Sequence, residues 1–302
     1  MNKIIIIAGP TASGKSQLAI EIAKKLDTEI VSADSMQIYK GMDIGTAKIK
    51  DDEMQGITHH MLDVVEINEN YSVSDYIDKA SQIISDLHSQ NKIPVICGGT
   101  GLYIDALLYP LSMGAKDDIV KNRLNEEYKK YGAEYMHAKL QAIDPQEAQK
   151  VHANNVKRVL RALEIYELTG QIKSEQHDRN QELKYDTLLI VLNPDRQVMY
   201  DRINKRVDKM FEDGLENEVK FIIRNRRGLF GSQAMQAIGY KEFEDYFDGL
   251  LTKRELVDLI KKGTRRYAKR QVTWFKRYPF SKFFDIDEKE KIMNEVDSFI
   301  KE

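Results

Sequence analysis

Residues 4–8 form a short apolar run that leads directly into the pattern G-x-x-x-x-G-K-[ST]. An apolar stripe at Leu18, Ile22 and Leu26 predicts a helix after it, and this strand–loop–helix order is typical of a phosphate-binding loop. Its glycines let successive N–H groups point at an anion, its lysine adds charge and its hydroxyl can bind Mg²⁺. The alternative is a glycine-rich turn with an incidental lysine. We expect a polyphosphate or diphosphate, with Mg²⁺ on Ser16, to be held by Gly9, Pro10, Thr11, Ala12, Ser13, Gly14, Lys15 and Ser16.

The composition is that of an ordinary globular protein. The chain has 302 residues, 42% of them hydrophobic, which is enough for one large or two modest domains. Its apolar runs are too short to span a membrane and no signal peptide precedes the first strand, so we expect a cytoplasmic protein. Cys97 is its only cysteine, which excludes a disulfide framework and a cysteine-based zinc site.

Strand and helix signals alternate over the first hundred residues. Apolar runs and helical periodicity predict, in order, strand, helix, strand, helix and strand at 4–8, 17–26, 29–32, 73–89 and 93–97. Such alternation is typical of an α/β fold with a doubly wound parallel sheet. Open sheets of this kind bind ligands at the carboxyl ends of their strands, so the glycine-rich segment 98–101 is expected at a binding site.

From about residue 116 to residue 182 the pattern changes to helices only. Asn154 or Asn155 can cap the clearest of them and Gly170 can close it. The predicted helices of this block are 119–131, 133–143, 145–152 and 156–169.

Strand character returns after the helical block, with a strand at 185–192, a helix at 195–211 that stops at Gly214, and a last short strand at 282–286. The economical topology is a phosphate-loop α/β core interrupted by an all-helical insertion. We expect the core to comprise residues 1–115 and 183–302 and the insertion to comprise residues 116–182.

Residues 261–277 contain four lysines, four arginines and no acidic residue. Tyr267, Gln271 and Trp274 continue an apolar stripe begun by Leu256 and Ile260 on one side of a helix. A charge run is usually a solvated face, but the missing carboxylates favour a helix that faces a polyanion. The basic residues fall within the other half of the circumference: Lys261, Lys262, Arg265, Arg266, Lys269, Arg270, Lys276 and Arg277.

Several polar residues could carry chemistry. Asp34 follows the second predicted strand, where a carboxylate can act as a base, assist a metal from its outer shell, or merely cap the next segment. Arg202 and Arg206 lie four apart on one predicted helix face and could clamp a diphosphate, although a solvated face explains them equally well. Arg158 and Arg161 leave the same two possibilities open.

Six segments, in order and spread over nearly the whole chain, resemble the bacterial tRNA dimethylallyltransferases: GPTASGKS (9–16), DSMQIYKGMDIGTAK (34–48), GGTGLY (98–103), RVLRALE (158–164), AIGYKE (237–242) and RYAKRQVTWF (266–275). The resemblance implies a phosphate-loop fold whose reaction does not consume ATP. That reaction transfers a dimethylallyl group from dimethylallyl diphosphate to N6 of the adenine at position 37 of tRNA, next to the anticodon, and releases diphosphate. Eukaryotic relatives add a C-terminal zinc finger, which we do not expect here.

The resemblance also implies roles for single residues. Asp34 would accept a hydrogen bond and a proton from the adenine amine, and Thr100 would lie beside the scissile C–O bond. Lys15 and Arg206 would stabilise the departing diphosphate, with Arg206 preferred over Arg202. The flipped nucleotide would contact Asp34, Ser35, Met36, Gln37 and Thr100. The insertion would contact tRNA through Arg123, Arg158, Val159, Leu160, Arg161 and Ala162.

Elementary chemistry agrees with this interpretation. Positive charge develops on the allylic carbon as diphosphate leaves, so stabilising the leaving anion should be the largest contribution of the protein. A stacked adenine does not expose N6 sufficiently, so the base should leave its stack. The expected partners are a tRNA anticodon stem-loop and dimethylallyl diphosphate, with Mg²⁺ as cofactor, no membrane and a monomeric enzyme. Three alternatives are a phosphate-loop kinase, a prenyltransferase acting on free AMP or ADP, and a nucleotide-dependent RNA-binding switch.

Overall fold

The computed structural model describes residues 2–109, 117–174, 182–224 and 227–301. The chain divides into two compact units. We call Met1–Leu108 with Leu183–Glu302 the α/β unit, and Tyr109–Glu182 the helical unit. No helix among the described residues is long and apolar enough to cross a membrane.

The α/β unit is built on a six-stranded sheet in which every neighbouring pair is parallel. The strand order is β3-β2-β4-β1-β5-β6, so β1 lies centrally and the doubly wound α/β prediction is confirmed. Five strands agree with the predicted runs, whereas β3 was not predicted because two histidines have no apolar pattern. The strands are β1 Lys3–Ala8, β2 Ile30–Ala33, β3 His59–His60, β4 Val95–Gly98, β5 Asp186–Leu192 and β6 Lys282–Phe284.

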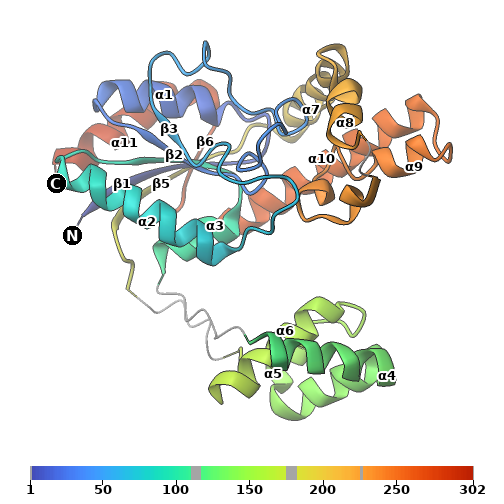
Figure 1. The fold of residues 1–302 in the computed structure, drawn as a ribbon. Coiled ribbons are helices and arrows are strands. Elements are labelled where there is room, and N and C mark those ends of the chain that lie inside the picture. The colour runs from blue at the N-terminus through green and yellow to red at the C-terminus, as the bar shows by residue number, and fades with distance from the viewer. Residues whose placement is uncertain (1, 110–116, 175–181, 225–226, 302) are drawn as a thin grey trace. The chain divides into compact units, whose positions relative to one another are not determined.

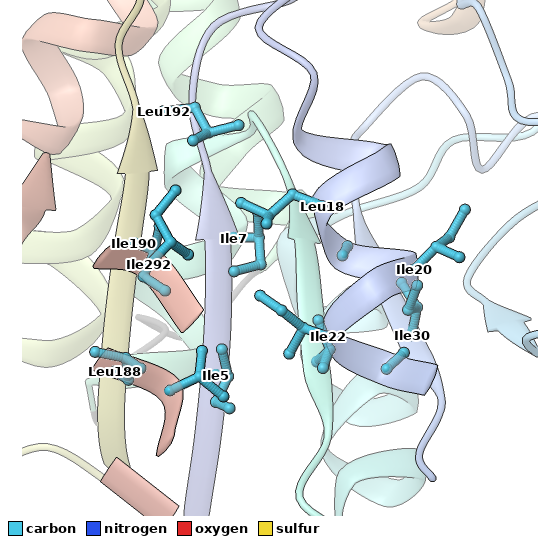
Figure 2. Close-up of a cluster of buried hydrophobic side chains, with 14 of the residues drawn as sticks. Ile5, Ile7, Leu18, Ile20, Ile22, Ile30, Leu188, Ile190, Leu192 and Ile292 are labelled. Carbon is cyan, nitrogen blue, oxygen red and sulfur yellow. The ribbon is translucent and has the colours of Figure 1, made fainter. Parts of the chain in front are cut away.

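Helices cover both faces of this sheet (Figure 1). The helices α1 (Lys15–Lys25) and α11 (Lys289–Lys301) pack on one face, where alternate residues of β1 and β5 point, and Figure 2 shows the resulting aliphatic cluster. The four isoleucines of β1, residues 4–7, are all fully buried, as expected for a parallel strand that is covered on both sides. In Figure 1, α2 and α3 lie across the opposite face. This burial holds the carboxyl ends of β1, β2 and β4 at one edge.

Within its described residues, the α/β unit contains eight α-helices and three short 3₁₀ helices. The predicted helix at 73–89 is α2, whose N-cap Ser72 and Asp75 form a capping box. The helix α3, which follows the glycine-rich segment, was not predicted. The helices of this unit are α1 Lys15–Lys25, α2 Val73–Ser89, α3 Gly101–Leu108, α7 Arg196–Glu212, α8 Leu215–Ile222, α9 Phe243–Phe247, α10 Lys253–Phe275 and α11 Lys289–Lys301, with short 3₁₀ helices at Arg227–Gly231, Ala234–Gln236 and Ile286–Glu288.

The helical unit contains α4 Asp118–Ile143, α5 Pro145–Lys150 and α6 Val156–Thr169. Two helices were predicted where α4 runs, and α4 is indeed interrupted at Gly132, whose φ of 83° and ψ of 178° are not helical. Gly170 closes α6 in the left-handed region, as predicted. Asn155 occupies the N-cap of α6 but its side chain makes no capping hydrogen bond, so the predicted side-chain cap is wrong.

Candidate active site

The phosphate loop connects β1 to α1, as its sequence pattern predicts. Gly9 has a φ of 147°, and a Cβ there would lie 2.6 Å from the carbonyl oxygen of Leu192. Gly14 has a φ of 92° and precedes α1 in the left-handed region. Lys15 folds back over the loop, and its Nζ donates to the carbonyl of Pro10 at 3.3 Å. The loop therefore adopts a tight turn that only glycine allows at these two positions.

A cavity of about 340 Å³ lies against this loop within the α/β unit. Its wall includes parts of the phosphate loop, of the segment after β2, of α7 and of α10. Ile238, Ile260 and Val207 make part of the wall apolar. Polar side chains converge on it from four segments distant in sequence, among them Lys15, Asp34, Gln37, Arg206, Tyr267 and Gln271. Such a mixed wall suits a ligand with an apolar group and an anionic group.

Asp34 lies immediately after β2 and lines the cavity, as do Ser35, Met36 and Gln37. Its Oδ1 accepts from the backbone N–H groups of Met36 at 2.9 Å and Gln37 at 3.4 Å. The side-chain amide of Gln37 donates to the carbonyls of Thr46 and Ala47 at 3.2 and 3.3 Å. One oxygen of Asp34 thus anchors the turn, and the carboxylate as a whole still faces the cavity.

Thr100 does not form part of the cavity wall, unlike the other residues expected around the flipped nucleotide. Its Oγ1 accepts from the backbone N–H of Ser35 at 3.0 Å and donates to the Ser35 hydroxyl at 3.3 Å. It also shares a hydrogen bond with the Tyr267 hydroxyl. Thr100 therefore contacts two residues of the wall, Ser35 and Tyr267, and its assignment beside the scissile bond stays a prediction.

Lys15 and Arg206 meet at the phosphate loop, where both line the cavity and a second cavity of similar size. Burial lowers the pKa of Lys15, the charge of Arg206 adds to this shift, and the charge of Asp34 opposes it. Burial also lowers the pKa of Arg206, but a guanidinium still keeps its charge. Arg202 lines neither cavity, so of the two arginines Arg206 is the one that lies against the phosphate loop.

Gln271 and Tyr267 of α10 were not predicted as site residues. Gln271 is 5% exposed, and its Oε1 accepts from the N–H of Thr11 at 3.0 Å while its Nε2 donates to the carbonyl of Gly99 at 2.9 Å. A Cβ on Gly99 would lie 2.0 Å from that Nε2. Burial raises the pKa of Tyr267 to about 12, so its phenol stays protonated at neutral pH. A glutamine inside an apolar stripe was the signal that could have identified this link between the two loops.

The helix α10 carries the basic run, but the predicted uniform basic face needs correction. Carboxylates are absent from the run itself, yet Asp208 of the neighbouring α7 pairs with Lys261 at 2.6 Å. Arg265 donates to Asn204 of α7 at 2.5 Å, and Arg270 lines the cavity. The helix ends at Phe275, before the last two basic residues. The exposed basic face of α10 consists of Lys262, Arg266 and Lys269. Arg270 is also exposed, but it lines the cavity as well.

In the helical unit, the residues expected to contact RNA fall into two groups. Val159 and Ala162 are 0% and 2% exposed and belong to its hydrophobic core, against which Leu160 packs. The side chains of Val159 and Ala162 lie on the inner face of α6, which packs on α4, and a contact of these two residues with RNA stays a prediction. The arginines lie at the surface: Arg158 is exposed, Arg123 pairs with Glu167, and Arg161 pairs with Glu164 at 2.7 Å.

Comparison with known proteins assigns the family. The sequence model described as IPP transferase matches residues 37–278. A tRNA dimethylallyltransferase of Caldanaerobacter subterraneus subsp. tengcongensis is 47% identical over 294 residues, which are 95% of this chain and 92% of the relative. The crystal structure of a full-length tRNA isopentenylpyrophosphate transferase from Bacillus halodurans matches with a TM-score of 0.73 and 40% identity, covering 100% of this chain and 99% of that chain.

A third similarity brings in a nucleic-acid complex. A eukaryotic dimethylallyltransferase, captured in crystallographic snapshots acting on tRNA, has a TM-score of 0.79 and 33% identity, covering 91% of this chain and 70% of that chain. The resemblance inferred from the six sequence segments is thus confirmed. This chain belongs to the IPP transferase family and is a prenyltransferase that modifies tRNA.

Proposed function

We propose that the cavity beside the phosphate loop is the place where a dimethylallyl group passes from dimethylallyl diphosphate to N6 of adenine 37 in tRNA. The observation that carries this proposal is that a carboxylate and two cations from three separate segments, Asp34, Lys15 and Arg206, line one cavity whose wall is otherwise partly apolar. The cations suit the diphosphate, the carboxylate suits an amine, and the apolar wall suits the five-carbon group.

The step we propose forms the bond between N6 and the terminal allylic carbon as the bond from that carbon to the diphosphate oxygen breaks. The N6 proton passes to Asp34, and the electron pair of the broken bond leaves with the diphosphate. Lys15, Arg206 and the N–H groups of the loop stabilise the growing negative charge, which is the principal electrostatic demand of this reaction. Oδ1 of Asp34 anchors the turn, so we assign proton acceptance to Oδ2.

Mg²⁺ fits this site through Ser16, which is exposed at the start of α1 and lines both cavities. Among the described residues there is no group of three or more His, Cys, Asp and Glu side chains that could hold a metal. Mg²⁺ is often bound through few protein ligands together with substrate phosphates. We therefore assign Ser16 and the diphosphate oxygens as its ligands. Bound there, Mg²⁺ would neutralise part of the diphosphate charge.

For the acceptor, we propose that adenine 37 leaves its stack and enters the cavity, while its anticodon stem-loop lies on basic surfaces of the protein. Lys262, Arg266 and Lys269 of α10 supply one such surface beside the cavity wall. Arg123, Arg158 and Arg161 of the helical unit supply another. We propose that the enzyme is a monomer and acts on tRNA in the cytoplasm.

Mass spectrometry of nucleosides from tRNA incubated with dimethylallyl diphosphate and Mg²⁺ tests the proposal. We expect N6-dimethylallyladenosine at position 37 with the wild-type protein, and no product with ATP as donor. Asp34→Asn keeps an acceptor for the Met36 and Gln37 amides but is a far weaker base, so kcat should fall about 10²–10⁴-fold with donor affinity nearly intact. Phosphoryl transfer from ATP, or equal efficiency with free AMP, would overturn the assignment.

A further inference from the structure

Glu218 of α8 holds a loop that lies far from it in the sequence. Its Oε2 accepts from the backbone N–H groups of Asp43 at 3.0 Å and Ile44 at 2.7 Å, and its Oε1 accepts from that of Gly45 at 3.2 Å. The hydroxyl of Tyr240 donates to the same Oε1 at 2.6 Å. One carboxylate thus receives four hydrogen bonds, three of them from consecutive backbone amides. Such charge-assisted bonds are roughly twice as strong as neutral ones.

Tyr240 completes this arrangement by packing against Gly45. Its side chain is fully buried, and burial raises its pKa well above the ordinary value, so its hydroxyl remains a donor. A Cβ on Gly45 would lie 2.4 Å from the Tyr240 ring, which explains why a glycine occupies this position. The segments AIGYKE and DIGTAK, which carry Tyr240 and Gly45, therefore meet in space through Glu218.

The loop held in this way forms part of the active-site wall. Gly45, Thr46 and Ala47 line the cavity. The carbonyls of Thr46 and Ala47 accept the side-chain amide of Gln37, and the carbonyl of Ala47 also accepts Nη2 of Arg206 at 3.5 Å. A displacement of this loop would therefore remove hydrogen-bond partners from two residues that face the substrates.

A second group of contacts, centred on Lys48, holds the two ends of this loop. Nζ of the buried Lys48 contacts the carbonyl of Tyr39 at 2.8 Å and the carboxylates of Asp43 and Asp63 at 2.6 and 2.5 Å. Lys48 thus ties residue 48 to residue 43, and the amides of residues 44 and 45 between them have Glu218 as their hydrogen-bond acceptor. The loss of Glu218 should therefore loosen the loop locally without unfolding it.

We propose that Glu218 is a positioning residue for prenyl transfer, which acts through the 43–47 loop to orient Arg206 and Gln37. This inference rests on the function proposed above for the cavity. It adds a residue that does not line the cavity and comes from a helix outside the six motif segments. Because a misplacement of about 1 Å can cost about 10²-fold in rate, the effect should appear mainly in kcat.

The test compares Glu218→Gln with Glu216→Gln on the same helix. A glutamine at 218 would present an NH₂ group to donors that now meet a carboxylate oxygen, so at least one bond must be lost. Glu216 instead pairs with Lys220 and Lys253 at 2.7 and 3.0 Å and contacts neither the loop nor the cavity. We expect Glu218→Gln to lower kcat about 10- to 100-fold, with the KM for tRNA nearly unchanged, and Glu216→Gln to match wild type.

Hydrogen exchange of the peptide that contains residues 43–45 gives a readout independent of the chemistry. We expect faster exchange in Glu218→Gln and wild-type exchange in Glu216→Gln. Tyr240→Phe keeps the ring over Gly45 and removes only the hydrogen bond to Glu218, so it should lower kcat less than Glu218→Gln does. In the Glu218→Gln background, the additional fall in kcat caused by Tyr240→Phe should be smaller than in the wild type. If Glu218→Gln does not fold, the Tyr240→Phe variant carries the same test.

The outcomes separate the two proposals. Faster loop exchange with lower kcat supports the positioning role, whereas faster exchange with unchanged kcat, or equal kcat in the two glutamate variants, overturns it. A failure of the proposed function would instead appear as the absence of prenylated tRNA with the wild-type protein.

Discussion

The cavity edge of the α/β unit, where β1, β2 and β4 end, and the surface of the helical unit both present polar residues. We call the former the active edge. The two regions differ in the hydrogen bonds and ion pairs that fix these side chains. At the active edge, the polar side chains bind backbone groups, two of them in distant segments: Gln271 joins Thr11 to Gly99, and Glu218 binds residues 43–45. In the helical unit, three arginines lie at the surface, and two of them pair with side chains: Arg123 with Glu167 and Arg161 with Glu164.

This difference matches two different tasks. Transition-state stabilisation requires charges and dipoles that are oriented before the reaction begins, and multiple bonds to backbone groups provide that order. Contact with a folded RNA backbone requires positive charge that adapts to phosphates, and long side chains in exposed ion pairs can exchange partners at small cost. Substitutions in the first region should therefore change kcat, whereas substitutions in the second should change tRNA binding.

Among the substitutions that test this comparison between the two regions, Arg206→Ala should have the largest effect. Arg206 lines both cavities and would face the departing diphosphate, so its loss should lower kcat on the order of 10²–10³-fold. Arg202→Ala is the matched control, because Arg202 occupies the same helix one turn away and lines neither cavity. Steady-state kinetics with saturating tRNA measures both. A collapse with Arg202→Ala and near-wild-type turnover with Arg206→Ala would show that the wrong arginine was assigned to the diphosphate.

Much of the fold could be predicted because its signals are local. The apolar run before the phosphate loop, the periodicity of residues 73–89 and Gly170 after α6 each depend on a few neighbouring residues. The two-residue strand β3 and the helix α3 could not be predicted in this way. The former pairs only because β2 presents an edge to it, and the latter begins within a glycine-rich segment that reads as a loop.

The residues that line the cavity were predictable only where they belong to a motif or where the family resemblance assigns them. Asp34, Lys15 and Arg206 follow from strand ends, the loop pattern and the family resemblance, and all three line the cavity. Gln271 and Glu218 act through partners more than 170 residues away, and no local pattern reports such a contact. The same limit explains why Lys261 looked uncompensated, since Asp208 reaches it from another helix.

An intermediate effect is expected from the exposed face of α10. Replacement of Lys262, Arg266 and Lys269 by alanine should raise the KM for tRNA about tenfold at low salt, with little change in kcat or in the KM for the donor. Each lost phosphate contact should reduce the log–log salt slope by about one unit. Filter-binding titrations over a series of salt concentrations measure this slope. The control is Lys205→Ala, which removes an exposed lysine of α7 and therefore measures the effect of losing positive charge in general. An unchanged slope in the triple variant would mean that tRNA does not lie on this face.

The smallest effect is expected in the helical unit and sharpens the comparison most directly. Arg158 is exposed on α6, whereas Arg123 already binds Glu167, which also lies 3.7 Å from Lys139. Arg158→Ala should raise the KM for tRNA by less than about fivefold, since exposed ion pairs contribute about 0.2–1 kcal/mol, and it should leave kcat at saturating tRNA unchanged. Arg123→Ala should have a smaller effect, because Arg123 must release Glu167 before it can bind a phosphate. Single-turnover rates at saturating and limiting tRNA distinguish the two parameters. A fall of kcat in Arg158→Ala would contradict the division of tasks, because it would give an adaptable surface residue the role of an oriented one.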